Sequence, residues 1–155
     1  MTRGRTALRA AVVAAAVVVA DQALKALVRA RVTPGDAERV LPGVQIINTR
    51  NSGVAFSLFS GGGPVVVVVA LIALGGLVAF VLAQGHRPLV WLPTGLLVGG
   101  AAGNLVDRLR EGSVTDFVKL PHWPAFNLAD VAITFGVIAL LIVLELRDDR
   151  HPRPA

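Results

Sequence analysis

The segment from Val65 to Ala83 contains no charged residue, and this feature limits the chain more than any other. As a helix it is long enough to cross a hydrocarbon core of roughly 30 Å. Its valine run would favour a strand in water, but an unpaired strand in a bilayer leaves backbone groups without hydrogen bonds. With 54% hydrophobic and 16% charged residues in 155 positions, the chain is too apolar for a water-soluble domain of this size. We therefore expect an integral membrane protein.

Three further apolar segments predict helices in the membrane. The third segment of the four carries Gly99, Gly100 and Gly103, which permit close approach of a neighbouring helix. We expect one all-α integral membrane domain over residues 1–155 with four transmembrane helices. The predicted spans are 8–28, 65–83, 89–106 and 128–146, with long loops 29–64 and 107–127 on one side and a polar C-terminal tail over 148–155.

The first segment has a second interpretation. Its arginine-rich start followed by the apolar run 10–20 is also typical of a secretory signal peptide. However, the apolar stretch continues past Asp21 and Lys25, and no small-x-small cleavage motif follows the run. We therefore expect this segment to remain as a transmembrane helix.

The first long loop carries a strand pattern. Val44 and Ile46 precede the turn-forming stretch 51–53, and Phe56 and Leu58 follow it. This arrangement predicts a small β-rich loop domain between the first and second helices, lying at the membrane surface. Basic residues are divided equally between the two sides of the predicted topology, so the positive-inside rule leaves the orientation open.

Composition excludes several classes of function. The absence of cysteine removes disulfides, thiol nucleophiles and cysteine-based zinc sites, and three histidines leave little for metal chemistry. An aromatic content of 5% is low for a nucleic-acid-binding protein, so the net charge of +5 fits arginines that flank membrane spans. We expect neither nucleic acid nor a metal as a partner.

Ionisable groups within spans are expensive and by default indicate a functional site. The predicted topology places every such candidate of this chain, given at the end of this paragraph, in the leaflet that faces the two long loops. Each also has a structural interpretation: Asp21 and Lys25 as an i, i+4 ion pair whose lysine reaches the surface, and Asp130 as a helix N-terminal acid capped by Asn127. The candidates are Asp21, Lys25, Asn104, Asp107, Arg108, Asp116 and Asp130.

Two carboxylates close together in a low-dielectric site share a proton near neutral pH, as in aspartic proteases. From the chemistry alone, Asp107 is as good a member of such a pair as Asp116 or Asp130. A serine triad would depend on His122, and a carboxylate-only Mg²⁺ site also stays open. A proton-relaying transporter, a channel subunit or a structural subunit would carry similar acids.

Five segments resemble the signature blocks of bacterial lipoprotein signal peptidase, signal peptidase II, in order and spacing over about residues 12–146. Thr115 and Val54 depart from the usual pattern without removing an acid. The blocks are Asp21-Gln22 with Lys25, the stretch 51–57 (NSGVAFS), the stretch 99–108 (GGAAGNLVDR), the stretch 114–117 (VTDF) and the stretch 126–130 (FNLAD).

This resemblance implies an aspartic peptidase of the bacterial cell membrane with both termini in the cytoplasm and the site toward the extracytoplasmic leaflet. Its catalytic residues would be Asp116 and Asp130, with Asp21 and Lys25 as a structural pair. The implied reaction cleaves the bond before the diacylglyceryl-modified cysteine of prolipoproteins, with water as nucleophile and no cofactor. Membrane lipids would be the other partner, and we expect a monomer. Residues implied to support the dyad or bind substrate are Asn51, Gly53, Asn104, Asp107, Arg108 and Asn127.

Overall fold

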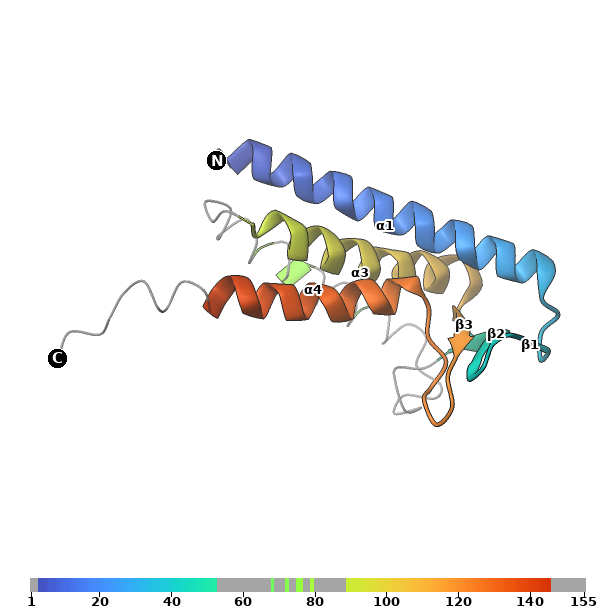
Figure 1. The fold of residues 1–155 in the computed structure, drawn as a ribbon. Coiled ribbons are helices and arrows are strands. Elements are labelled where there is room, and N and C mark those ends of the chain that lie inside the picture. The colour runs from blue at the N-terminus through green and yellow to red at the C-terminus, as the bar shows by residue number, and fades with distance from the viewer. Residues whose placement is uncertain are drawn as a thin grey trace.

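Three long helices lie side by side in the computed structural model, with an antiparallel sheet at one end (Figure 1). The structure describes residues 3–52 and 89–145, together with the isolated positions 68, 72, 75, 76 and 79, which are helical. The rest of the predicted span 65–83 lies outside the described residues. The helices are α1 (Arg3–Arg31), α3 (Trp91–Glu111) and α4 (Leu128–Glu145), and the strands are β1 (Ala37–Leu41), β2 (Val44–Asn51) and β3 (Val114–Lys119).

Two of the described helices are long and apolar enough to cross a membrane: Gly4–Arg31, within α1, and α4. Both present large apolar side chains at the surface, and Val19 and Phe135 are 68% and 61% exposed. Such exposure is unfavourable in water and suits contact with lipid. The third described helix, α3, packs against both α1 and α4.

Close packing of α3 depends on its glycines. A Cβ added to Gly99 would lie 2.8 Å from the carbonyl oxygen of Ala14 in α1. A Cβ added to Gly100 would lie 2.5 Å from the carbonyl oxygen of Ala129 in α4. The small residues therefore let the backbones of α1 and α4 approach α3 from two sides, as the sequence predicted.

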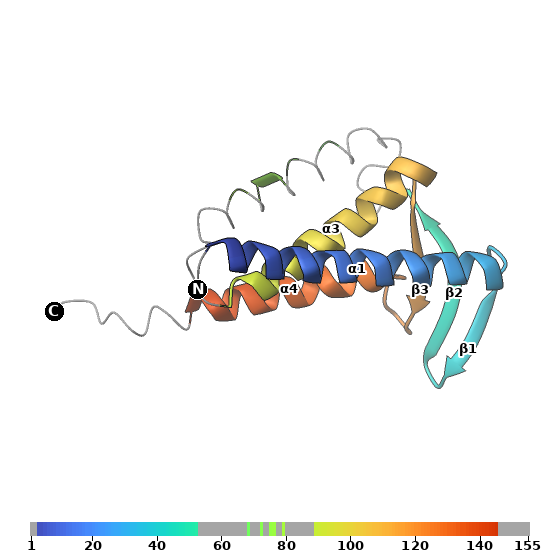
Figure 2. The same cartoon turned by 90° about the horizontal axis from the view of Figure 1, so that it is seen from above.

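The sheet has the order β1-β2-β3, and its strands run across the helix axes (Figure 2). β1 and β2 form a hairpin whose two-residue turn contains Gly43 at φ 77°, a left-handed conformation that glycine adopts without penalty. Asn51, which the sequence placed in a turn-forming stretch, is the last residue of β2, and the turn of the described hairpin lies at 42–43. Phe56 and Leu58 lie outside the described residues.

The third strand corrects the predicted fold class, which placed all β structure between the first and second helices. β3 comes from the loop between α3 and α4 and pairs with β2, with Thr49 opposite Asp116. The segment from Val114 to Phe117 is buried throughout. A strand buried on both faces lacks the alternation of apolar and polar residues by which a strand is recognised. The fold is a helical membrane enzyme fold with a small antiparallel sheet.

Two local features bring the polar residues together. Gly112, at φ 69°, ends α3 with its N–H donating to the Arg108 carbonyl at 3.1 Å, so the chain turns directly into β3. After β3 the chain folds back and Phe126 pairs with Val118. This pairing delivers Asn127, the residue before α4, to the side of β3.

Candidate active site

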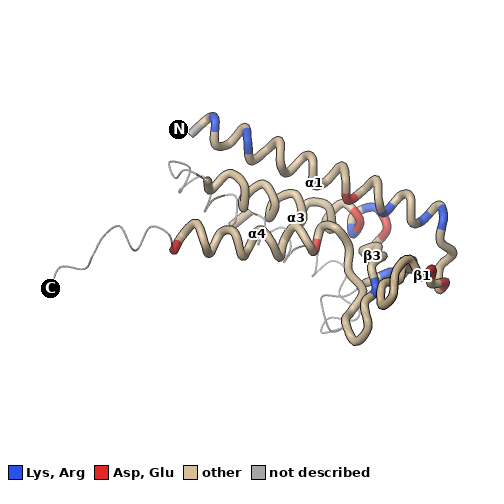
Figure 3. Tube along the Cα trace, viewed as in Figure 1, with Lys and Arg blue, Asp and Glu red and all other residues tan. Residues whose placement is uncertain are grey.

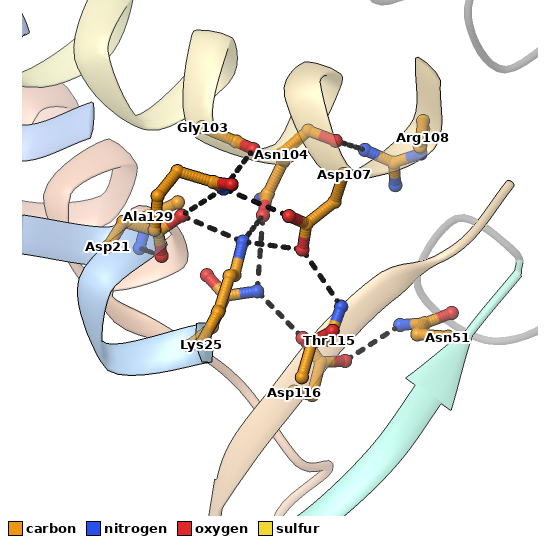
Figure 4. A network of polar contacts seen from close by, with 12 residues as sticks. Asp21, Lys25, Asn51, Gly103, Asn104, Asp107, Arg108, Thr115, Asp116 and Ala129 are labelled. Atoms are coloured by element: carbon orange, nitrogen blue, oxygen red, sulfur yellow. Dashed lines mark hydrogen bonds and ion pairs between the residues drawn. The ribbon is translucent and has the colours of Figure 1, made fainter. Parts of the chain in front are cut away.

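Charged residues of the described chain gather where the helices meet the sheet (Figure 3). α1 carries none between Arg9 and Asp21, and α4 carries none between Asp130 and Glu145. At the sheet end, a network of polar contacts joins α1, α3, β2, β3 and α4 (Figure 4). The acids that the sequence predicted to share one leaflet therefore lie together.

Lys25 is the cation of this network and is fully buried. Its Nζ donates to Asp21 Oδ2 at 2.8 Å, to Asp107 Oδ2 at 3.0 Å and to Asn104 Oδ1 at 3.0 Å. An ammonium group has three N–H donors, and each has an acceptor here. The predicted ion pair between Asp21 and Lys25 is confirmed. The prediction that the lysine reaches the surface is wrong, because acceptors on α3 hold it inside.

Two aspartates form ion pairs with Lys25, and Arg29 Nη1 lies 4.0 Å from one of them, Asp107. Asp21 Oδ1 also accepts from the backbone N–H of Ala129 at 3.0 Å, which ties α1 to the first turn of α4. Asp107 accepts from the backbone N–H of Thr115 at 3.0 Å and from Gln22 Nε2 at 2.9 Å. Removing one member of such a buried group costs about 3–5 kcal/mol, because it leaves a charge unpaired. Asp21, Lys25 and Asp107 therefore hold the helices together.

Asn127 and Asp130 form a reciprocal cap at the start of α4. Asn127 Oδ1 accepts from the Asp130 N–H at 3.0 Å, and Asp130 Oδ2 accepts from the Asn127 N–H at 3.2 Å. This pattern satisfies two backbone donors that a helix start otherwise leaves free. The cap predicted from the sequence is confirmed, and it fixes the orientation of the Asp130 carboxylate.

Asn127 also reaches the other acid of the pair. Its Nδ2 donates to Asp116 Oδ1 at 2.7 Å, and Asn51 Nδ2 donates to Asp116 Oδ2 at 3.1 Å. Asp130 Oδ1 accepts from Asn104 Nδ2 at 2.8 Å. Within the described residues, every hydrogen bond to these two carboxyls comes from an asparagine. The pair is thus held by neutral donors, and Asn127 donates to both members.

The pKa of Asp116 is raised from 3.8 to about 6. Burial is the largest cause, because the side chain is 3% exposed, and the negative charge of Asp130 adds to the rise. The amides of Asn51 and Asn127 and the charge of Lys25 act in the opposite direction. A carboxyl with this pKa carries a proton for part of the time near neutral pH.

These contacts distinguish Asp107 from Asp116 and Asp130, three acids that were equally suited to a carboxyl pair on chemistry alone. Asp107 accepts from the Lys25 ammonium and two further donors, and the Arg29 guanidinium lies 4.0 Å away, so Asp107 is held as a carboxylate and is poorly suited to a proton relay. Asp116 and Asp130 have neutral donors and influence each other electrostatically. Such a pair can activate a water with one member and donate a proton with the other.

The remaining predicted residues have different positions. Arg108 is half-buried, and its Nη1 donates to the Asn104 carbonyl at 3.4 Å. Gly53 lies outside the described residues. His122 is exposed and forms no part of the network.

Two participants were missed by the sequence reasoning. Gln22 donates through Nε2 to Asp107 and to the Gly103 carbonyl at 3.2 Å. Thr115 accepts from Arg29 Nη1 at 3.0 Å. Gln22 is a polar residue inside an apolar segment, and this signal would have identified it. The role of Thr115 depends on contacts between distant segments, which no local pattern reveals.

The fold and the site together define a helical membrane protein with a pair of carboxyls, one buried and one half-buried, where the helices meet the sheet. Residues 13–146 match the family model described as Signal peptidase (SPase) II. The chain belongs to the signal peptidase II family, and it is therefore a membrane protease of lipoprotein processing.

Relatives and solved structures agree with this family. The lipoprotein signal peptidase of Syntrophomonas wolfei subsp. wolfei is 40% identical over 140 residues, which cover 90% of this chain and 94% of that protein. That of Moorella thermoacetica is 42% identical over 126 residues, covering 80% and 84%. A solved structure described as a bacterial membrane enzyme superposes with a TM-score of 0.85 at 30% identity, covering 94% of this chain and 93% of that one.

Proposed function

We propose that this chain is a lipoprotein signal peptidase that hydrolyses the peptide bond preceding the diacylglyceryl-modified cysteine of prolipoproteins. Asp116 and Asp130 are its catalytic aspartates. The observation that carries this assignment is the set of neutral asparagine donors around these two acids, in contrast to the cation that neutralises Asp107. Family membership supplies the reaction class.

The two carboxyls have different roles in the proposed mechanism. The pKa of Asp116 is raised, and in its protonated form Asp116 donates a hydrogen bond to the scissile carbonyl. The Asp130 carboxylate accepts a proton from a water, whose oxygen forms the new bond to the carbonyl carbon. The C–N bond then breaks, and the departing amine takes a proton from the pair. Water is the nucleophile and no cofactor takes part.

Supporting residues hold this pair in place. Asn51, Asn104 and Asn127 orient the two carboxyls through the hydrogen bonds described above. Arg108 and Gly53 contribute to the substrate side of the site. Asp21 and Lys25 keep α1 against α3 and α4.

The proposed topology has four transmembrane helices, with both termini in the cytoplasm and the sheet outside the cell membrane. The polar network lies where the described helices meet the sheet (Figure 4). A lipid-modified cysteine anchored in the outer leaflet presents its preceding peptide bond at this same level. The lipid anchor therefore delivers the scissile bond to Asp116 and Asp130. The enzyme acts as a monomer.

The test compares two substitutions in the pair with two outside it. We expect Asp116→Asn and Asp130→Asn each to lower the cleavage rate by about 10²- to 10⁴-fold, because each removes a proton-transfer group. Purified protein in detergent is incubated with a synthetic diacylglyceryl lipopeptide, and the cleaved product is followed by mass spectrometry. Diacylglyceryl prolipoprotein should accumulate in cells that express only these variants.

Two controls separate chemistry from structure. Glu111→Gln removes an exposed acid paired with Arg50 at 3.1 Å, and we expect a rate near that of the wild type. Asp107→Asn should lower the melting temperature strongly. The protein that remains folded should lose little of its cleavage rate. Normal cleavage by a folded Asp116→Asn or Asp130→Asn protein would overturn the catalytic assignment.

A further inference from the structure

A second polar site lies on the sheet, outside the network of acids. Arg39 in β1 lies opposite Gln45 in β2, and Gln45 lies opposite Lys119 in β3. Directly opposed residues share one face of a sheet, so these side chains form a row across all three strands. The row borders a pocket of about 210 Å³ whose other lining residues are Gly43, Leu120, Pro121 and His122.

The pocket has the chemistry of an anion site. Arg39 and Lys119 carry positive charge, His122 adds a ring nitrogen, and none of the lining residues is acidic. Glu38, the nearest acid along β1, points to the opposite face by the alternation of a strand. Lys119 Nζ donates to the Trp123 carbonyl at 2.7 Å, which leaves two of its N–H donors for a ligand.

The surroundings of the pocket are those of a membrane interface. The β1–β2 hairpin extends to one side of α1 and α4 (Figure 2). Large apolar side chains are exposed on the hairpin and on the segment after β3: Val40 at 52%, Leu41 at 62% and Trp123 at 62%. Tryptophan beside basic residues is typical of the headgroup level of a bilayer. The apolar helix α4 begins at Leu128, a few residues after the pocket wall.

We infer that this pocket binds the phosphodiester group of an anionic phospholipid in the leaflet beside the sheet. Arg39 and Lys119 contact the phosphate oxygens, while Trp123 and Leu41 lie among the glycerol and upper acyl groups. Binding there holds the sheet, and with it β3 and Asp116, at a fixed depth in the interface. The site takes no part in the cleavage chemistry.

The test measures lipid binding without catalysis, so its outcome does not depend on the proposed dyad. Full-length protein in nonionic detergent is titrated with dioctanoyl phosphatidylglycerol, and adducts are quantified by native mass spectrometry. We expect the double variant Arg39→Gln/Lys119→Gln to bind this lipid roughly 20-fold more weakly, from the usual contribution of two basic residues near an anionic surface. Dioctanoyl phosphatidylcholine should bind more weakly than phosphatidylglycerol to the wild type.

A matched control removes the same charge elsewhere at this end of the molecule. Arg31→Gln/Arg110→Gln changes two exposed arginines outside the pocket and should keep wild-type affinity. The variant Arg39→Lys/Lys119→Arg keeps both cations and should also bind. Equal loss in either of these variants, equal binding of the two lipids, or displacement of phosphatidylglycerol by an equal concentration of inorganic phosphate would overturn the inference.

Discussion

Three asparagines donate every hydrogen bond that the described residues make to the carboxyl groups of Asp116 and Asp130. A neutral amide stabilises a carboxylate less than an ammonium or guanidinium group does. The pKa of Asp116 therefore stays high although two amides donate to it. Lys25 forms its ion pairs with Asp21 and Asp107, and its charge lowers the pKa of Asp116 less than burial raises it.

The raised pKa of Asp116 predicts a pH-dependent stability. The unfolded chain releases this proton near pH 3.8 and the folded chain near 6, so folding binds a proton between these values. The contribution is fully present below pH 3.8 and is lost as pH rises through 6. Relative to Asp116→Asn, the wild type should lose about 2.4 kcal/mol of stability between pH 4 and 7.5. Thermal unfolding in detergent across this range measures the difference.

The exposed acid Asp36, in the turn before β1, supplies the control for that series. Asp36→Asn should follow the wild type at every pH. A wild-type protein that becomes more stable than Asp116→Asn as pH rises would show that Asp116 is held as a carboxylate, contrary to its proposed role as proton donor.

The sequence identified most residues of the site, but it did not predict which residues each of them would contact. Asp21, Lys25 and Asp107 were recognisable because charges within apolar segments are rare and costly. Their distances depend on how α1 packs against α3, which is why Lys25 was expected at the surface. In the sequence, only the family resemblance favoured Asp116 over Asp107 as a catalytic residue. Both acids lie within the predicted loop 107–127, so their position did not distinguish them.

At the scale of the elements, the glycines of α3 set the distance between helices that carry different parts of the site. Gly99→Ala would place a methyl group 2.8 Å from the Ala14 carbonyl in α1, and a backbone atom cannot move aside as a side chain can. We expect a loss of about 1–3 kcal/mol in stability and a lower cleavage rate. Thermal unfolding and lipopeptide cleavage measure the two effects.

Gly4→Ala is the matched control for this prediction, since an added Cβ there meets nothing within 4 Å. It should be neutral or slightly stabilising, because alanine favours a helix. A Gly99→Ala protein as stable as Gly4→Ala would mean that α1 and α3 can separate without cost.

Helices and strands differed in how well the sequence predicted them. Long uncharged runs indicate helices in a membrane, because a single helix forms its backbone hydrogen bonds within itself and a single strand does not. The sheet was predicted only in part, since β1 is wholly exposed and the first half of β3 is wholly buried. Neither strand shows the alternation by which a half-buried strand is recognised.

At the scale of the whole molecule, the proposed orientation can be tested because the chain has no cysteine of its own. Asp36→Cys, in the exposed turn before β1, should react with a membrane-impermeant maleimide added outside intact cells or spheroplasts. Arg5→Cys, at the far end of α1, should react only after the membrane is made permeable. The reverse pattern would place the sheet in the cytoplasm.

The cap at the start of α4 also affects how the protein is made. Asp130 lies in the last described helix and Asn127 directly precedes it, while Asp21 accepts from the Ala129 N–H of that same helix. A ribosome delivers the N-terminal segments first, so the nascent chain carries Asp116 into the membrane before its proposed partner exists. A nascent chain that has not reached residue 130 lacks the proposed second aspartate, so the proposed dyad cannot cleave a precursor before α4 is made.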